Sequence, residues 1–216
     1  MARRTRIVLP ALALLLLFGA PGAKADTITY TFQGTGSGSI GDDSFSHMQF
    51  TITVTADTND ISEFTLTCGS SPCTILDVPA TTATITVDGL TSAITSSIGV
   101  FDNQTVGVLG LSRITGPGPG GISMDLLDLT DPTFTTYNLM TSLGPVGPLG
   151  VGNLPEFNCS AGCVVTDLGD LTLTSASKVT FTDPVSTPEP SAILLLGCGA
   201  LALVALRRKF LANSRS

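Results

Sequence analysis

The sequence predicts an all-β fold, an antiparallel β-sandwich or jelly roll, for the central part of this 216-residue chain. Polar and apolar residues alternate in many short stretches, which is the period-2 pattern of strands that bury one face. Threonine, serine and glycine lie between runs of isoleucine, valine, leucine and phenylalanine, and β-branched and aromatic residues favour strands. Between residues 26 and 185 we find no convincing apolar period of 3.6 residues, so a sheet-based architecture follows.

The expected strands follow one another at short intervals with turn residues between them. Asp88-Gly89 is a favourable two-residue hairpin turn between two of them. In chain order the expected strands cover residues 27–33, 45–56, 61–67, 74–78, 82–89, 90–97, 99–101, 105–112, 122–130, 134–140, 164–168 and 170–182. The segments 116–121 and 142–155 are rich in proline and glycine and are expected to be loops, the second a mobile surface excursion.

Residues 36–41 read GSGSIG and match the glycine spacing of a dinucleotide-binding turn. That turn must open a helix, whereas another strand pattern follows here. We therefore interpret these glycines as a flexible hairpin loop.

Residues 1–25 have the pattern of a secretory signal peptide. Three arginines open it, residues 7–18 are apolar, and Ala23 and Ala25 form the small-residue cleavage pattern. The alternative is an uncleaved anchor helix, for which the apolar core is short. The exported β-sandwich domain is then expected to cover residues 26–185.

The charge of the chain is unevenly distributed. Only Arg113 and Lys178 lie between residues 26 and 190, a segment that contains all 17 aspartates and glutamates. A surface this acidic repels nucleic acid and anionic lipid, so the sequence excludes a nucleic-acid partner.

The same segment offers few side chains for catalysis. His47 is the only histidine and lies in a strand pattern, where a surface role is expected. A G-x-S-x-G elbow is absent, and one histidine cannot build a His-based metal motif. The carboxylate pairs Asp42 with Asp43 and Asp125 with Asp128 lack flanking aromatic rings to hold a sugar and are interpreted as surface charge. We expect neither an enzyme nor a cofactor.

Four of the five cysteines form two close pairs, Cys68 with Cys73 and Cys159 with Cys163. In an oxidising compartment such local pairs favour two disulfides. The alternative is a zinc site of all four thiolates, but the spacings differ from those of C-x2-C knuckles. Cys198, the fifth, lies in the C-terminal apolar run, where a small buried residue is the simpler interpretation.

One turn gathers hard oxygen donors that suit calcium, which takes such ligands from loops. These donors belong to Asp57, Asn59, Asp60 and Glu63. The spacing lacks the glycine and the distal glutamate of an EF-hand loop, so the alternative is a solvated turn.

The C-terminus combines a short motif, an apolar run and a basic end. The motif is Pro188, Glu189 and Pro190, and residues 191–206 carry no charge. As a transmembrane helix this run spans about 24 Å, short of the roughly 30 Å hydrocarbon core, a gap that bilayer thinning and snorkelling can close. Three cations then hold the end in the cytoplasm, namely Arg207, Arg208 and Lys209.

This tripartite tail resembles the PEP-CTERM sorting signal of exported bacterial proteins. The resemblance covers residues 186–210, and residues 211–216 follow as a cytoplasmic tail. Residues 27–55 also resemble the start of many small β-rich proteins that bear this tail. The resemblance implies that exosortase, a membrane transpeptidase-like enzyme, recognises the tail and that the tail is removed. Export by the Sec machinery and a transient stay in the inner membrane precede that step.

We therefore expect a cell-surface or extracellular-matrix protein whose mature domain is structural or adhesive. The resemblance implies a bacterium that makes extracellular polysaccharide, which makes polysaccharide of a biofilm matrix a candidate partner. The alternative is a carbohydrate-binding module on one face of the sandwich. Such a module needs exposed aromatic rings, and the candidates are Tyr30, Phe134 and Tyr137.

Overall fold

The computed structural model describes residues 27–114, 123–152 and 164–183. They form antiparallel strands with two short 3-10 helices, so the all-β prediction is confirmed. The elements are β1 (Thr27–Ile40), β2 (Asp43–Asp57), η1 (Thr58–Asp60), β3 (Ser62–Cys68), β4 (Ser71–Val87), β5 (Leu90–Ala93), β6 (Ile98–Asn103), β7 (Val108–Ile114), β8 (Ser123–Thr130), η2 (Pro132–Thr136), β9 (Leu143–Leu149), β10 (Val164–Thr166) and β11 (Gly169–Asp183).

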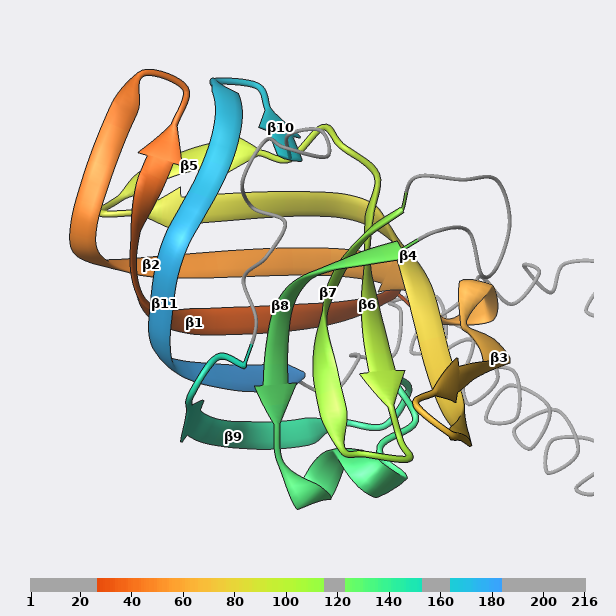
Figure 1. Ribbon diagram of the computed structural model, residues 1–216. Coiled ribbons are helices and arrows are strands. Elements are labelled where there is room, and N and C mark those ends of the chain that lie inside the picture. Colours follow the sequence, from red (N-terminus) through yellow and green to blue (C-terminus); the bar gives the residue numbers. More distant parts are fainter. Residues whose placement is uncertain (1–26, 115–122, 153–163, 184–216) are drawn as a thin grey trace, which may run out of the picture. The chain divides into compact units, whose positions relative to one another are not determined.

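The strands form one continuous 11-stranded sheet that folds over itself at β4. Its order is β10-β11-β1-β2-β4-β6-β7-β8, with β3 and β5 added on β4 and β9 on β11. Residues 80–87 of β4 pair with β2 and β5, whereas residues 71–79 pair with β3 and β6. In Figure 1, β6, β7 and β8 cross β1, β2 and the second half of β4. The two layers of the expected sandwich therefore share a strand, as in orthogonal sheet packing.

The main core fills the space between these layers. Phe181 of β11 is its aromatic centre, with the ring of Phe32 at a centroid distance of 5.2 Å and that of Phe134 at 5.9 Å. Alternate residues of β1 and of the second half of β4 point into this core, which is the pattern that predicted them as strands. Burial of these apolar side chains is the main favourable contribution to folding.

The Asp88-Gly89 hairpin between β4 and β5 is confirmed. Both residues have positive φ, 49° and 84°, as the two central residues of a type I′ turn require. The two strands predicted on either side of residue 80 are one long strand, because β4 continues where it passes from one layer to the other.

Residues 36–40 continue β1 as a strand, so the prediction of a flexible loop is wrong there. A Cβ on Gly38 would lie 2.0 Å from the carbonyl oxygen of Thr172, and one on Gly36 would lie 2.7 Å from that of Ser175. Strands β1 and β11 thus approach so closely that only glycine fits.

The predicted strand at residues 134–140 is also wrong, because its first residues lie in η2. Asp131 caps this helix, since its Oδ1 accepts a hydrogen bond from the Thr133 amide at 2.8 Å. Pro132 follows at the first helical position, where its fixed φ and missing N–H suit a helix start.

The proline-rich segment predicted as a mobile loop forms β9 at Leu143–Leu149. It pairs with β11 through Leu143, Val146 and Leu149 in an irregular register. Its two prolines fall between these paired residues, as is usual for proline on an edge strand.

No helix among the described residues is long and apolar enough to span a membrane. The predicted C-terminal helix at residues 191–206 and the signal peptide with Ala23 and Ala25 lie outside the described residues.

Candidate functional site

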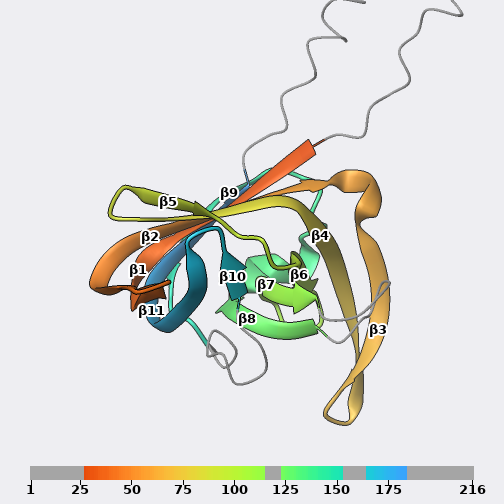
Figure 2. The same cartoon turned by 90° about the horizontal axis from the view of Figure 1, so that it is seen from above.

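Strand β6 is covered on both of its faces, and all six of its residues are buried. Its inner face contributes Ile98 and Val100 to the main core. Its outer face contributes Phe101 to a second, smaller cluster with Cys73 and Ile75. The hairpin of β3 and β4 stands beside β6 and β7 (Figure 2) and supplies most of that cluster.

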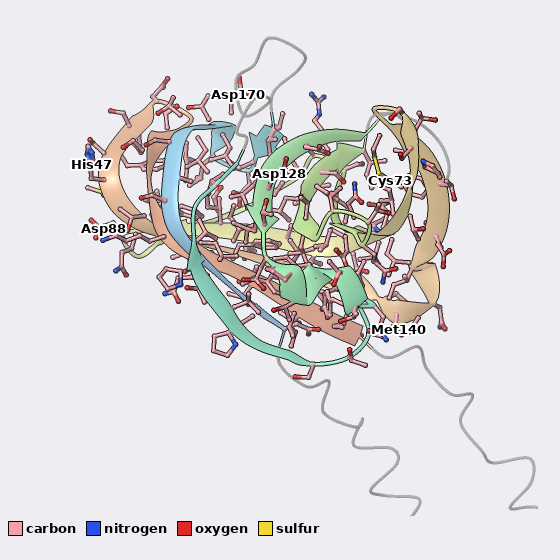
Figure 3. The ribbon with its side chains drawn as sticks, turned by 60° about the horizontal axis from the view of Figure 1, so that its bottom comes forward. His47, Cys73, Asp88, Asp128, Met140 and Asp170 are labelled. Atoms are coloured by element: carbon pink, nitrogen blue, oxygen red, sulfur yellow. A yellow bond between two sulfur atoms is a disulfide. The ribbon has the colours of Figure 1, made fainter. Side chains whose placement is uncertain are left out.

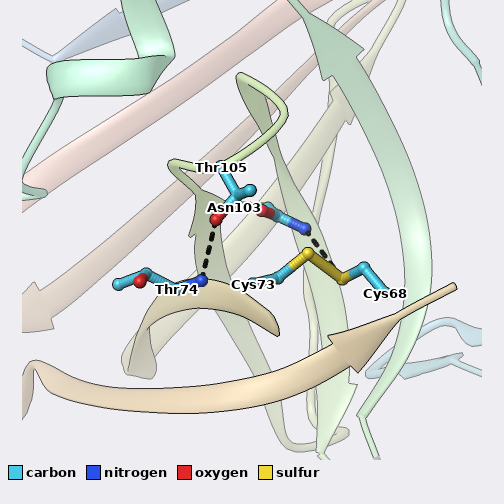
Figure 4. The surroundings of a disulfide bond; sticks show 5 residues. All are labelled: Cys68, Cys73, Thr74, Asn103 and Thr105. Carbon is cyan, nitrogen blue, oxygen red and sulfur yellow. Dashed lines mark hydrogen bonds between the residues drawn. A yellow bond between two sulfur atoms is a disulfide. The ribbon is translucent and has the colours of Figure 1, made fainter. Parts of the chain in front are cut away.

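The disulfide predicted between Cys68 and Cys73 is confirmed and closes the tip of this hairpin. Two hydrogen bonds connect the tip to the end of β6 (Figure 4). Asn103 Nδ2 donates to Cys68 Sγ at 3.7 Å, and the Thr74 amide donates to Thr105 Oγ1 at 2.9 Å. The hairpin is thereby held next to the outer face of β6. The second predicted disulfide, Cys159 with Cys163, lies outside the described residues, as does Cys198.

A pocket of about 330 Å³ opens on this outer face between β3 and β8. This volume is at the lower end of the range for small-molecule sites. Phe64, Ile75 and Phe101 are among the apolar side chains that line it. The apolar lining resembles that of ordinary ligand pockets, which combine an apolar wall with a few polar groups.

The polar lining of the pocket consists of Asp77, Asn103, Asp125 and Asp128. Strand register places Asp77, Phe101, Gly110 and Asp128 in one row across β4, β6, β7 and β8. In the described part of the chain, the Oδ1 atoms of Asp77, Asn103 and Asp128 are buried without a hydrogen-bond partner. All three atoms are acceptors, so only a hydrogen-bond donor can satisfy them.

Burial perturbs the carboxylates of the pocket. It raises the pKa of Asp77 to about 6, although the nearby Ser112 hydroxyl lowers that pKa in part. Burial, together with the negative charge of Asp125, raises the pKa of Asp128 to about 7. Asp125 is the most exposed of the three, and desolvation of its carboxyl group beside the pocket also raises its pKa. Perturbed carboxylates in a pocket mark this region as the candidate binding site of the described domain.

Two further carboxylates lie on the other side of the sheet, inside the main core. Tyr137 donates its hydroxyl to Asp183 Oδ2 at 2.5 Å, and burial raises the pKa of Asp183 to about 6. Burial raises the pKa of Asp102 to about 7, and neither of its oxygens has a hydrogen-bond partner among the described residues. Both side chains are fully buried, so no ligand reaches them directly.

The predicted calcium donors form a capped turn. Asp57 Oδ1 accepts a hydrogen bond from the Asn59 amide at 2.8 Å and caps η1, which includes Asp60. Within residues 27–114, 123–152 and 164–183, no three His, Cys, Asp or Glu side chains converge as a metal ion requires, Glu63 included. The turn thus has a structural explanation in this capping bond.

His47 lies in an exposed bulge of β2, where two residues of β2 face Ser37 of β1. Its φ is 54°, its amide donates to Ser37 Oγ at 3.0 Å, and its Nδ1 is 2.9 Å from Ser46 Oγ. Figure 3 shows His47 at one end of the described domain and Cys73 toward the other, with Asp128 between them. The structure therefore does not bring the histidine together with the carboxylates of the pocket.

The aromatic candidates for sugar binding are all buried. Tyr30 and Phe134 are 0% exposed and Tyr137 is 3% exposed, and all three pack against Phe181. They offer no platform for a sugar ring, which counts against a sugar-binding face built on these residues.

Sequence reasoning missed the pocket because its polar residues come from separate strands. A signal was present, since Asp77, Asp125 and Asp128 interrupt otherwise apolar strand segments. The interpretation of Asp125 and Asp128 as surface charge fails for Asp128, which is half-buried and lines the pocket.

Comparison with known protein families identifies a sorting motif at the C-terminus. The PEP-CTERM protein-sorting motif matches residues 186–209. The resemblance of the tail to this signal is therefore confirmed, and the signal implies an exported protein that exosortase sorts to the cell surface. The motif Pro188-Glu189-Pro190 lies in the matched stretch and outside the described residues. No curated protein and no solved structure matches the chain.

Proposed function

We propose that residues 26–185 are the cargo of this sorting signal and serve as a structural or adhesive component of the cell surface or extracellular matrix. The observation that carries the proposal is the position of the sorting motif. The match begins at residue 186, directly after the last described strand ends at Asp183. The β-domain and the signal are therefore consecutive, with little chain between them.

The strand pairing and the disulfide of the domain support a structural role. Strands β1 and β11 pair over most of their length although they are far apart in the sequence, and β4 connects both layers. A disulfide closes the tip of the β3–β4 hairpin. Such a domain suits an oxidising extracellular environment. His47 does not line the pocket, which supports a role without catalysis.

In this proposal the Sec machinery exports the chain and the signal peptide is removed after Ala25. Residues 191–206 then hold the chain briefly in the inner membrane, with Arg207, Arg208 and Lys209 on the cytoplasmic side. Exosortase recognises Pro188-Glu189-Pro190 and releases the domain. The final location is the cell surface or the polysaccharide-rich matrix around the cell.

The sorting step is tested by a variant of the motif and a matched control. Glu189→Gln removes the one acidic charge of the matched stretch, whereas Pro184→Ala changes a proline just before it. We expect mass spectrometry to find the control protein outside the cell without residues 191–206 and to find E189Q uncleaved in the membrane fraction. Recovery of intact wild-type peptides that span residues 185–206 from the extracellular fraction would refute the proposal.

The structural role is tested by fractionating the matrix of producing cells. We expect the mature domain to co-sediment with extracellular polysaccharide and the matrix to be weaker in cells that lack the protein. A freely diffusing protein whose absence leaves the matrix unchanged would contradict a structural or adhesive role, even if sorting occurs as proposed.

A further inference from the structure

We propose that the pocket between β3 and β8 binds a small organic cation, an ammonium or guanidinium group carried on a compact apolar body. The sorting signal lies outside these residues and says nothing about a ligand for them, so the pocket would bind its cation whether or not exosortase releases the domain. Three features of the pocket carry this assignment: its acceptor oxygens, its charge and its apolar wall.

The polar atoms of the pocket favour a ligand that donates several hydrogen bonds. Asn103 is 9% exposed, and its Nδ2 is already engaged with Cys68 Sγ. Its Oδ1 is buried without a partner in the described ranges, as are the Oδ1 atoms of Asp77 and Asp128. Buried acceptors without donors are costly, so a ligand that supplies donors gains from entering. Ammonium and guanidinium groups donate three and five.

The charge of the pocket favours a cation. Three of its four polar residues are aspartates, and cations are scarce between residues 26 and 190. Arg113 follows Ser112 on β7. It pairs with Ile98, a main-core residue of β6, so Arg113 is on the inner face of the layer. A cation is therefore attracted to the pocket before it makes any contact.

Strand register places the remaining charged groups of the neighbouring strands on the other face of the layer, away from the pocket. Glu63 on β3 pairs with Leu76, and Asp102 on β6 pairs with Leu76 and Leu109, which lie in the main core. Asp125, which is exposed, is the third carboxylate that lines the pocket. Asp77, Asp125 and Asp128 are thus the groups whose ionisation sets the charge seen by a ligand.

The apolar wall of the pocket selects against a bare ion. Phe64 and Ile75 line the pocket beside the carboxylates and offer contact to a hydrocarbon body. The metal alternative is disfavoured because no three carboxylates in the described domain converge on one point. A neutral sugar is disfavoured because Phe101, which lies between the carboxylates, is 7% exposed and offers no open ring face.

Nuclear magnetic resonance of the purified, 15N-labelled full chain tests the proposal. The probes are phenethylamine, which carries an ammonium on a phenyl ring, and 2-phenylethanol, which has nearly the same body without the charge. We expect the amine to shift amide signals of β3, β6 and β8 at pH 8 and to bind at least about ten-fold more tightly than the alcohol.

Variants locate the binding. Asp77→Asn and Asp128→Asn should each weaken amine binding by about five-fold or more and leave alcohol binding unchanged. Asp88→Asn, an exposed aspartate at the β4–β5 turn, is the matched control and should bind the amine as the wild type does. The spectrum of each variant reports whether it is folded.

A second experiment measures the pH dependence of binding to the wild-type protein. Lowering the pH from 8 to 5 protonates Asp77 and Asp128, whose pKa values are raised, so amine affinity should fall while alcohol affinity does not. Equal affinity for amine and alcohol, amine binding independent of pH, or shifts outside the pocket would each overturn the proposal. Shifts of the same signals by Ca²⁺ at micromolar concentration would overturn it in favour of a metal site.

Discussion

Desolvated carboxylates lie on both faces of the layer formed by β4, β6, β7 and β8, but their access to solvent differs. On the inner face, Asp102 is sealed in the main core, and the same core contains Asp183. On the outer face, Asp77 and Asp128 are half-buried and line a pocket. Burial raises the pKa in all four. Desolvation alone therefore does not identify a binding site, because only the outer pair lines a pocket.

The largest expected effect is the pH dependence that both faces share. The folded-state pKa values of these aspartates are raised to about 6 or 7, above the unfolded value of about 3.9. The folded state therefore binds more protons between about pH 4 and pH 7, and the free energy of unfolding falls as the pH rises through that window. After allowance for solvent screening we expect a gain of about 3 kcal/mol on going from pH 8 to pH 5.

Calorimetry at pH 8 and pH 5 checks this dependence, and the midpoint of unfolding should rise by about 5–10 °C. A midpoint that stays constant or falls on acidification would show that these carboxylates are not buried as described.

The next effect concerns the inner face alone. Tyr137→Phe removes the hydroxyl that donates to Asp183, a fully buried carboxylate. We expect it to lower the free energy of unfolding by about 2–3 kcal/mol in urea denaturation at pH 8. The matched control is Tyr30→Phe, whose hydroxyl donates to the neutral Leu139 carbonyl at 2.6 Å, and it should cost about 1 kcal/mol. Equal losses would argue that Asp183 is not charged at pH 8.

Removal of the disulfide tests how independently the β3–β4 hairpin on the outer face is stabilised. Replacement of Cys68 and Cys73 by serine opens a short loop, which costs about 2 kcal/mol in the chain-entropy description. Because only the projecting hairpin depends on this bond, hydrogen exchange should accelerate in β3 and in the first half of β4. Amides in the paired strands β1 and β11 should exchange no faster than the lower global stability of the variant requires. Uniform acceleration would instead mean that the hairpin and the main core unfold together.

The smallest effects separate the two faces directly. Asp102→Asn removes a buried charge without a hydrogen-bond partner among the described residues. It should raise the free energy of unfolding by about 1–2 kcal/mol at pH 8. At pH 5 it should have little effect, because Asp102 is then protonated. Asp128→Asn should change stability by about 0.5 kcal/mol or less, since this side chain is only half-buried. Equal gains from both variants in urea denaturation would contradict the difference in burial.

Strands with one buried face could be predicted from the sequence. The first residues of β1, the second half of β4 and the end of β11 alternate between buried and half-exposed residues, and the sequence shows the same period. Strand β6 could be predicted only in part, because both of its faces are covered and alternation is lost. The turn at Asp88-Gly89 was predictable because its backbone geometry depends on two adjacent residues.

The errors have a common physical reason. Gly36 and Gly38 look like loop residues, but their role depends on β11, which is more than a hundred residues away. Residues 143–149 look like a loop until β11 offers an edge for pairing. The pocket depends on strand order in the same way, since Asp77 and Asp128 share a row only because β6 and β7 lie between their strands. A short segment of sequence does not indicate which distant strand it will pair with.

The pairing of β1 with β11 has a consequence for the order of folding during export. Phe32 pairs with Phe181, so the first described strand lacks one of its two neighbours until nearly the whole domain has been translocated. Contacts between such distant residues close slowly, because a large loop must be ordered before they form. The hairpins β1–β2 and β3–β4 can form while the chain is still emerging, but the main core cannot close before β11 arrives. A chain shortened before residue 169 would leave β1 with an open edge, ready to pair with another chain.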